Sequence, residues 1–327
     1  MYLDYYQLRE YPFTLASDPR FLYFSDGHKE AMAGLLYSLR ERKGVGLLLG
    51  EPGTGKTTVL AAVLEMLPGG VHAQSLDSPL HATPEAVLAA IVRGFGLAGG
   101  DGLSANLAVL QGYLRERHAA GECVLLIIDE AQDLNPMALE QVRLLTNLER
   151  QGHKLLQIIL SGQPELAEHL RLTNGRALHQ RVAVRCQLEA LSGPEVQAYL
   201  SARLERAGAQ RGLFEAPAVD RIHQLSAGVP RVINVIADHC LLAGFAAQAP
   251  RVNRALVDRV AVKLEIQPAP MAAVPAPAPA ATGAAVPPAA PPPAPVPVPG
   301  RGSRLPGVLQ RFASGCARYA GFAPSGD

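Results

Sequence analysis

The sequence of 327 residues contains no tryptophan, and aromatic residues make up only 5% of it. Its cysteines are also few and far apart, and they form neither a Cys-x-x-Cys pair nor a zinc-ligand spacing. They are Cys123, Cys186, Cys240 and Cys316. This pattern excludes a disulfide framework and favours reduced thiols in a cytoplasmic protein.

The sequence has no excess of charge and no long apolar run. Lys and Arg number 30 against 29 Asp and Glu, a net charge of +1, which argues against a surface that attracts nucleic acid strongly but is compatible with a local basic patch. Residues 1–4 do not begin a signal peptide, because no basic segment is followed by an apolar one. No apolar run reaches the roughly 18 residues of a membrane-spanning helix. We therefore expect no transmembrane segment.

Residues 50–57 read Gly-Glu-Pro-Gly-Thr-Gly-Lys-Thr, a complete phosphate-binding loop (Walker A motif). An apolar run precedes this Gly-rich loop and a helical pattern follows it, so it lies at a strand-to-helix turn. Its glycines let backbone N–H groups point at phosphate oxygens, and Lys56 is expected to reach the β- and γ-phosphates. The residues predicted to bind ATP here are Gly50, Glu51, Pro52, Gly53, Thr54, Gly55, Lys56, Thr57 and Thr58.

A second motif follows at residues 124–130, where five apolar residues precede Asp129 and Glu130 (Walker B motif). The apolar run predicts a central strand buried on both faces. We expect Asp129 to hold Mg²⁺ together with the Thr57 hydroxyl, and Glu130 to orient and deprotonate the attacking water. The alternative is a buried strand that ends in a solvated acidic turn. Both motifs in this order predict an enzyme that uses ATP and Mg²⁺ and releases ADP and phosphate.

Strand and helix patterns alternate through the first part of the chain and predict an α/β fold with a parallel sheet covered on both faces. Strands are expected near 45–49, 71–76, 124–129, 155–160 and 182–188. Helices are expected near 28–42, 57–67, 84–95, 104–118 and 136–150, and then, without strands, at 193–207, 217–226, 230–247 and 253–264.

These patterns divide the chain into four parts: a nucleotide-binding domain (1–188), a small all-helical lid (189–266), a Pro/Ala-rich linker (267–300) and a short basic amphipathic tip (301–327). The linker has no charged or aromatic residue, so it cannot bury enough surface to fold. The tip is either a docking helix or a frayed tail. The aromatic residues of segment 1–24 have few basic neighbours, and we expect them to pack on the nucleotide-binding domain.

The chain resembles the ExeA/GspA-type AAA+ ATPases of bacterial secretion and type IV pilus systems over about residues 1–266. Besides the two nucleotide motifs, the resemblance is carried by Tyr-Pro-Phe at 11–13, Asp-Pro-Arg-Phe-Leu-Tyr at 18–23 and Ser-Gly-Gln-Pro-Glu-Leu at 161–166. It implies a P-loop AAA+ module followed by a helical lid. Members of the secretion branch often continue into a membrane-spanning helix and a peptidoglycan-binding domain. These 327 residues hold neither, so we do not expect contact with the cell wall.

The resemblance also implies roles for residues outside the two motifs. Gln163 corresponds to the sensor that follows the fourth strand, with Ser161 as the rival. Arg181 corresponds to an arginine finger that acts on the neighbouring subunit's nucleotide, and its rivals are Arg176 and Arg185. Arg231, in Gly-Val-Pro-Arg at 228–231, corresponds to the second sensor, which faces the nucleotide of its own subunit.

Three functions are compatible with these residues. The first is an oligomeric ATPase that drives assembly of an envelope export system (secretion, pilus or exopolysaccharide), is cytoplasmic or peripheral at the inner membrane, and has an inner-membrane protein as partner. The second is a DNA-associated ATPase that serves transposition. The third is a nucleotide-gated switch with very slow turnover, against which the presence of Glu130 argues. Acidic residues lie among the arginines of the lid, so we do not expect nucleic acid as the partner.

Overall fold

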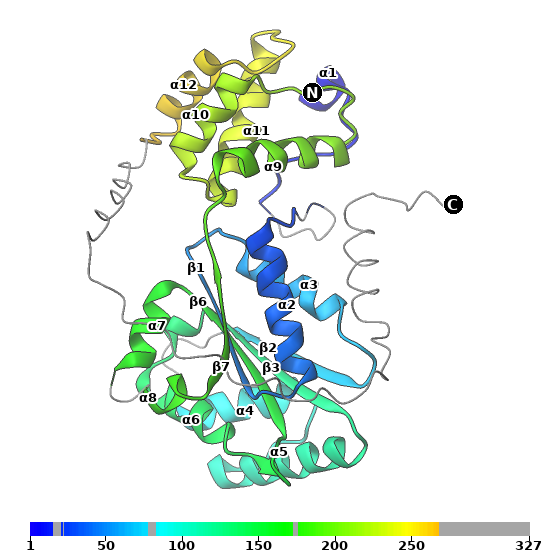
Figure 1. Cartoon of the computed structure of the whole chain (residues 1–327), viewed down its shortest axis with the longest axis vertical. Helices are drawn as coiled ribbons and strands as arrows, with labels where there is room; N and C mark the ends of the chain where they lie inside the picture. The colour runs from blue at the N-terminus through cyan, green and yellow to red at the C-terminus, as the bar shows by residue number, and fades with distance from the viewer. Residues whose placement is uncertain (16–20, 22, 78–82, 173–175, 268–327) are drawn as a thin grey trace, which may run out of the picture. The chain divides into compact units, whose positions relative to one another are not determined.

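The fold is built on a parallel sheet, and one of its interior strands precedes the Gly-rich loop. In the computed structural model, which describes residues 1–15, 21, 23–77, 83–172 and 176–267, β1 (Val45–Gly50) pairs with β6 (Leu156–Gly162) and β7 (Val182–Leu188). β3 (Cys123–Asp129) pairs with β6, and β2 (Val71–Asp77) pairs with β3. The order is β2-β3-β6-β1-β7 with every pair parallel, as the α/β prediction requires (Figure 1).

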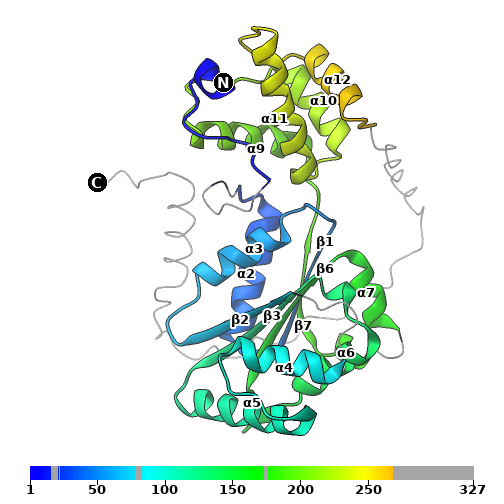
Figure 2. The ribbon, with the colours of Figure 1, turned by 180° about the vertical axis from the view of Figure 1, so that it is seen from behind.

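Alternate residues of each strand enter two different apolar clusters, one on each face of the sheet. Leu47 and Leu49 of β1 belong to one cluster, whereas Leu48 belongs to the other. Helices α2 (Asp26–Arg40) and α3 (Lys56–Glu65) cover the Leu48 face. The opposite face is covered by α4 (Pro84–Gly94), α5 (Gly102–Ala119), α6 (Pro136–Leu145), α7 (Pro164–Arg171) and α8 (Arg176–His179), as Figure 2 shows from behind. Burial on both faces explains why the central strands are apolar throughout.

The structure corrects one helix boundary. The helix expected at 136–150 ends at Leu145, because β4 (Glu149–Arg150) and β5 (His153–Lys154) form a short antiparallel hairpin. Gln151 and Gly152 in its turn have φ values of 52° and 79°. Positive φ at both turn residues is typical of the tight turns that match the strand twist. Helices α7 and α8 and the short 3-10 helix η2 (Ala131–Asp133) were not predicted.

A separate apolar cluster holds the four helices that follow β7, namely α9 (Gly193–Arg206), α10 (Ala216–Ser226), α11 (Pro230–Ala246) and α12 (Arg254–Lys263). The N-terminal segment belongs to the same cluster. Tyr2 and Tyr6 of α1 (Tyr2–Tyr6), and Phe13 beyond it, are buried among the lid residues. The prediction that the aromatic rings pack on the nucleotide-binding domain is therefore wrong for these three, whereas Phe24 does pack against the Leu48 cluster of that domain.

Hydrogen bonds fix the N-terminal segment on the helical lid. The Tyr6 hydroxyl donates to the carbonyl of Ala249 at 3.0 Å, and the Tyr2 hydroxyl donates to Asp238. The backbone N–H of Arg9 donates to the carbonyl of Ala207 at 2.7 Å. Each buried phenol thus has a partner, which is what allows a tyrosine to be buried with its hydroxyl.

Some predicted features lie outside the described residues, namely Cys316, the tip and all but Gln267 of the linker. The three cysteines within the described part, Cys123, Cys186 and Cys240, are free thiols. Among the described helices, none is both long and apolar enough to span a membrane.

We predict that Gly228→Ala destabilises the protein strongly. Gly228 has φ +76°, and a Cβ there would lie 2.0 Å from the backbone oxygen of Leu191. The left-handed backbone alone costs a non-glycine residue about 1–2 kcal/mol, so with the clash we expect a loss above about 2 kcal/mol. Thermal and urea unfolding measure it. Gly112→Ala is the control: no heavy atom lies within 4 Å of a Cβ on this α5 glycine, and we expect a gain of about 0.5–1 kcal/mol.

Candidate functional site

The Gly-rich loop joins β1 to α3 and depends on its glycines. Gly53 and Gly55 have φ values of +83° and +101°, a region that glycine enters without strain. A Cβ on Gly50 would lie 2.6 Å from Thr54 Oγ1. The loop is therefore wound tightly just before the first turn of α3, the kind of turn that binds phosphate.

Lys56 is the first residue of α3 and only 5% of it is exposed. Its Nζ donates to the carbonyl of Gly50 at 2.8 Å and to that of Glu51 at 3.3 Å. An ammonium group has three N–H donors, so the loop's own carbonyls engage two of them. The side chain is thereby held folded over the loop.

His28 also supports the loop, although in the sequence it stands out only as a polar residue at the start of a helix. Its Nε2 lies 3.1 Å from the Thr54 carbonyl, and its Nδ1 lies 2.6 Å from Ser25 Oγ, which caps α2. A carbonyl only accepts, so Nε2 carries the proton and Nδ1 accepts from Ser25. A Cβ on Gly55 would lie 2.9 Å from this Nε2, so the absence of a side chain at Gly55 leaves room for the imidazole ring of His28.

Asp129 connects three elements at the carboxyl end of the sheet. Its Oδ2 accepts from Thr57 Oγ1 of α3 at 3.0 Å, and its Oδ1 accepts from Ser161 Oγ of β6 at 2.7 Å. The Glu130 N–H donates to the same Oδ1 at 3.0 Å. The sequence predicted that Asp129 and Thr57 act together, and the structure brings them into direct contact.

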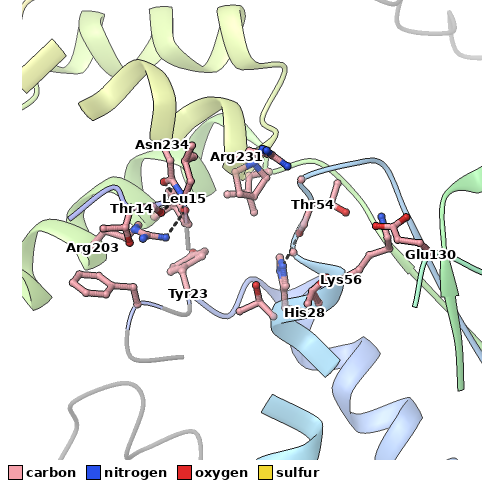
Figure 3. Close-up of a pocket in the computed structure, with 18 residues that line it drawn as sticks. Thr14, Leu15, Tyr23, His28, Thr54, Lys56, Glu130, Arg203, Arg231 and Asn234 are labelled. Carbon is pink, nitrogen blue, oxygen red and sulfur yellow. Dashed lines mark hydrogen bonds between the residues drawn. The ribbon is translucent and has the colours of Figure 1, made fainter. Parts of the chain in front are cut away.

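Glu130 follows with an exposed side chain and a backbone at φ 49° and ψ 41°. This left-handed conformation costs a glutamate about 1–2 kcal/mol. It turns the chain directly into η2, and the carboxylate lines the same pocket as Lys56. Figure 3 shows Glu130 and Lys56 at one end of that pocket.

The pocket has a volume of about 220 Å³ and is lined by the loop on one side and by the helical lid on the other. Pro230 and Arg231 from the start of α11 line it, and the Arg231 N–H lies 3.3 Å from the Gly53 carbonyl. A Cβ on Gly53 would lie 2.7 Å from the Cβ of Arg231. The predicted second sensor is therefore next to the loop, with an exposed side chain.

The other end of the pocket is formed by residues that sequence reasoning missed (Figure 3). The Tyr199 hydroxyl donates to Asn234 Oδ1 at 2.8 Å and accepts from Arg203 Nη1 at 2.8 Å. Arg203 Nε donates to the carbonyl of Pro12 at 2.6 Å, and the ring of Tyr23 packs edge-on against Tyr199. In the sequence, only the many aromatic residues of segment 1–24 pointed to this end of the pocket. The residues that they meet here, such as Tyr199, lie in helices far along the chain.

Gln163 and Ser161, the rival sensors, differ in their contacts. Ser161 is fully buried and donates to Asp129. Gln163 is the N-cap of α7, and its N–H donates to Gln132 Oε1 at 3.0 Å. Both lie at the end of β6 beside the acidic residues of β3, so a sensor role for Gln163 stays a prediction.

Arg181 contacts its own subunit in this structure. Its Nη1 donates to the Arg143 carbonyl at 3.1 Å and to Thr146 Oγ1, at the C-terminal end of α6. A cation at this position donates hydrogen bonds to the last carbonyls of the helix and interacts favourably with the negative end of the helix dipole. Of its rivals, Arg176 is exposed, and Arg185 is exposed beside His179. The arginine-finger assignment stays a prediction.

The donor atoms around Asp129 suit a magnesium ion. They are a hydroxyl and a carboxylate, the hard oxygen ligands that Mg²⁺ prefers. Among the described residues, no group of three or more His, Cys, Asp or Glu side chains gathers. A site with one carboxylate and one hydroxyl matches the way Mg²⁺ is bound when phosphate oxygens and water complete its shell.

Comparison with known proteins agrees with this geometry. The family described as "AAA domain" matches residues 39–170. General secretion pathway protein A of Aeromonas hydrophila is 42% identical over 248 residues, which are 75% of this chain and 45% of that protein. The chain thus carries an AAA domain and is similar to AAA+ proteins of the ExeA/GspA type. It spans less than half the length of this curated relative.

Solved structures similar to this chain support the fold alone. A structure of Drosophila ORC bound to DNA matches with a TM-score of 0.61 at 17% identity, over 82% of this chain and 67% of that one. Cdc6p from Pyrobaculum aerophilum matches with a TM-score of 0.59 at 18% identity, over 72% and 66%. At such low identity they say nothing about substrate or partner.

We predict that His28 makes stability depend on pH. Burial lowers the pKa of its imidazole below the usual 6.5, opposed by the Thr54 hydrogen bond and the charge of Glu195. Just below pH 6.5 the unfolded chain therefore binds a proton that the folded chain does not, and the free energy of unfolding decreases as the pH falls.

The measurement is urea unfolding between about pH 7.5 and 5.5, across the usual histidine range. His28→Gln, which stays neutral, should lose less stability than the wild type over this interval. His169→Gln, at an exposed position on α7, is the control and should follow the wild type. Equal slopes for His28→Gln and the wild type would contradict the prediction.

Proposed function

We propose that the protein hydrolyses ATP to ADP and phosphate in a magnesium-dependent reaction. The observation that carries the proposal is the 3.0 Å contact between Thr57 of the Gly-rich loop and Asp129 at the end of β3. It joins a phosphate-binding turn to a carboxylate at the same end of the sheet. Glu130, the next residue, lines the pocket and supplies a general base. Hydrolysis needs such a base, whereas nucleotide binding does not.

The chain's own residues divide the work along the pocket. The loop N–H groups and Lys56 bind the phosphates, and Arg231 approaches them from the helical lid. Glu130 accepts the proton of the attacking water, and Gln163 orients that water from the end of β6. The adenine ring lies at the other end, near Tyr23 and Asn234.

Thr57 and Asp129 would hold Mg²⁺, which supplies charge neutralisation on the phosphate oxygens when bound. The hydroxyl and the carboxylate contact each other directly. Ser161 donates to the other carboxylate oxygen and would keep Asp129 oriented toward the ion.

The process we propose is assembly of an envelope export system, by a homo-oligomer at the cytoplasmic side of the inner membrane. The support is the 42% identity to general secretion pathway protein A. An inner-membrane protein of that system would be the partner. Arg181 or an exposed rival such as Arg176 would act across the subunit boundary, and Arg181 would first have to leave the end of α6.

The central test is Glu130→Gln. This change keeps the size of the side chain but removes its basicity, so we expect nucleotide affinity within about threefold of wild type and a loss of hydrolysis by about 10²–10⁴-fold. Phosphate release and binding of a fluorescent ATP analogue measure the two quantities. Lys56→Ala is the matched control and should lose binding itself. Wild-type turnover by Glu130→Gln would remove Glu130 as the base.

Duplex DNA distinguishes the proposed process from the transposition alternative. We expect DNA to leave the rate and KM of ATP hydrolysis unchanged within about twofold at about 50 mM salt, where electrostatic binding is strong. The net charge of +1 gives little counterion release to drive binding. DNA stimulation that declines steeply with added salt would favour the DNA-associated ATPase instead.

A further inference from the structure

Gln132 lies between Glu130, the predicted base, and residues 161–163, which hold the two predicted sensors and are called the sensor turn. It forms a hydrogen bond with each. Its Nε2 donates to Glu130 Oε2 at 2.7 Å, and its Oε1 accepts from the Gln163 N–H at 3.0 Å. The carboxylate can only accept and the backbone N–H can only donate, so the orientation of the amide is fixed by its partners.

Few side chains satisfy both partners at this position. The bridge needs one donor and one acceptor on a neutral group of this length. A glutamate would keep the acceptor for Gln163 but repel Glu130, whereas an asparagine is one methylene shorter. A Cβ on Gly162 would lie 2.6 Å from Gln132 Oε1, so the glycine before the sensor leaves room for the amide.

The bridge acts on a side chain that little else orients. The Glu130 side chain is exposed and its backbone is left-handed, and the bond to Gln132 is the one described contact of its carboxylate. The sensor turn is held at two points, through Ser161 to Asp129 of β3 and through Gln163 to Gln132 of η2. A displacement of that turn therefore changes the direction of the Glu130 carboxylate.

We propose that Gln132 is a positioning residue for ATP hydrolysis: it orients the Glu130 carboxylate and couples that orientation to the turn formed by residues 161–163. The inference rests on the proposed ATPase function. Gln132 itself takes no proton and binds no phosphate. Its contribution is to hold the base in one direction, which raises the fraction of bound ATP that is ready to react.

The test is Gln132→Glu in the full chain, with steady-state hydrolysis measured from about pH 6 to 9 around the wild-type optimum. We expect kcat to fall at least about 10-fold while KM and the affinity for a fluorescent ATP analogue stay within about twofold. The acidic limb of the pH–rate profile should move to higher pH, because two adjacent carboxylates disfavour each other's ionisation. The other charged groups of this site, which are Asp129, Lys56 and Arg231, are the same in both proteins.

Two further variants separate positioning from folding. Gln132→Met keeps the volume and removes both bonds, so kcat should fall without a change in melting temperature. The double variant Glu130→Gln/Gln132→Glu should lose no more activity than Glu130→Gln alone, since the second change acts through Glu130. An additional loss in the double variant would indicate a merely structural role and overturn the proposal.

The possible failures are distinguishable. Wild-type kcat and an unshifted pH profile for Gln132→Glu would overturn the positioning role and leave the ATPase intact. A wild-type protein that binds ATP without hydrolysing it, under conditions where Lys56→Ala binds none, would overturn the proposed function and this role with it.

Discussion

The site depends on the parallel register of three strands. β1 and β3 both pair with β6, and Ile128 lies opposite Leu160 while Leu49 lies opposite Gly162. This register brings the carboxyl ends of all three strands to one edge, where the Gly-rich loop, Asp129 and Ser161 meet. Because side chains alternate along a strand, a shift by one residue would turn Asp129 into an apolar cluster. The fully buried leucines and isoleucines of these strands therefore fix the polar contacts at their ends.

Much of the sheet was predictable, because buried strands have a strong and local signal. The runs that become β1, β3 and β6 are mostly apolar, and the predicted bounds differ by one or two residues. The hairpin formed by β4 and β5 was missed since each of its strands has two residues. Such elements contribute no periodicity, and only the pair Gln151–Gly152 marked the turn.

The site was predictable only where its residues are adjacent in sequence. The Gly-rich loop and the acidic pair are local motifs whose chemistry can be read directly. His28, Asn234 and Gln132 were missed for another reason: their roles arise from contacts across 26 residues for His28 to Thr54, 220 for Asn234 to Thr14 and 31 for Gln132 to Gln163. No composition or spacing rule reports such contacts without the fold. The N-terminal aromatic segment was misplaced for the same reason, since nothing local distinguishes a ring that packs on the helical lid.

The attachment of the N-terminal segment to the helical lid has a consequence for synthesis on the ribosome. Tyr2 and Tyr6 are made more than 230 residues before their partners Asp238 and Ala249. At about 5–20 residues per second, these rings wait for at least ten seconds or so. The sheet can close during that interval, since all its strands precede residue 189. These two tyrosines are thus made before the sheet but are buried only after the helical lid has been made.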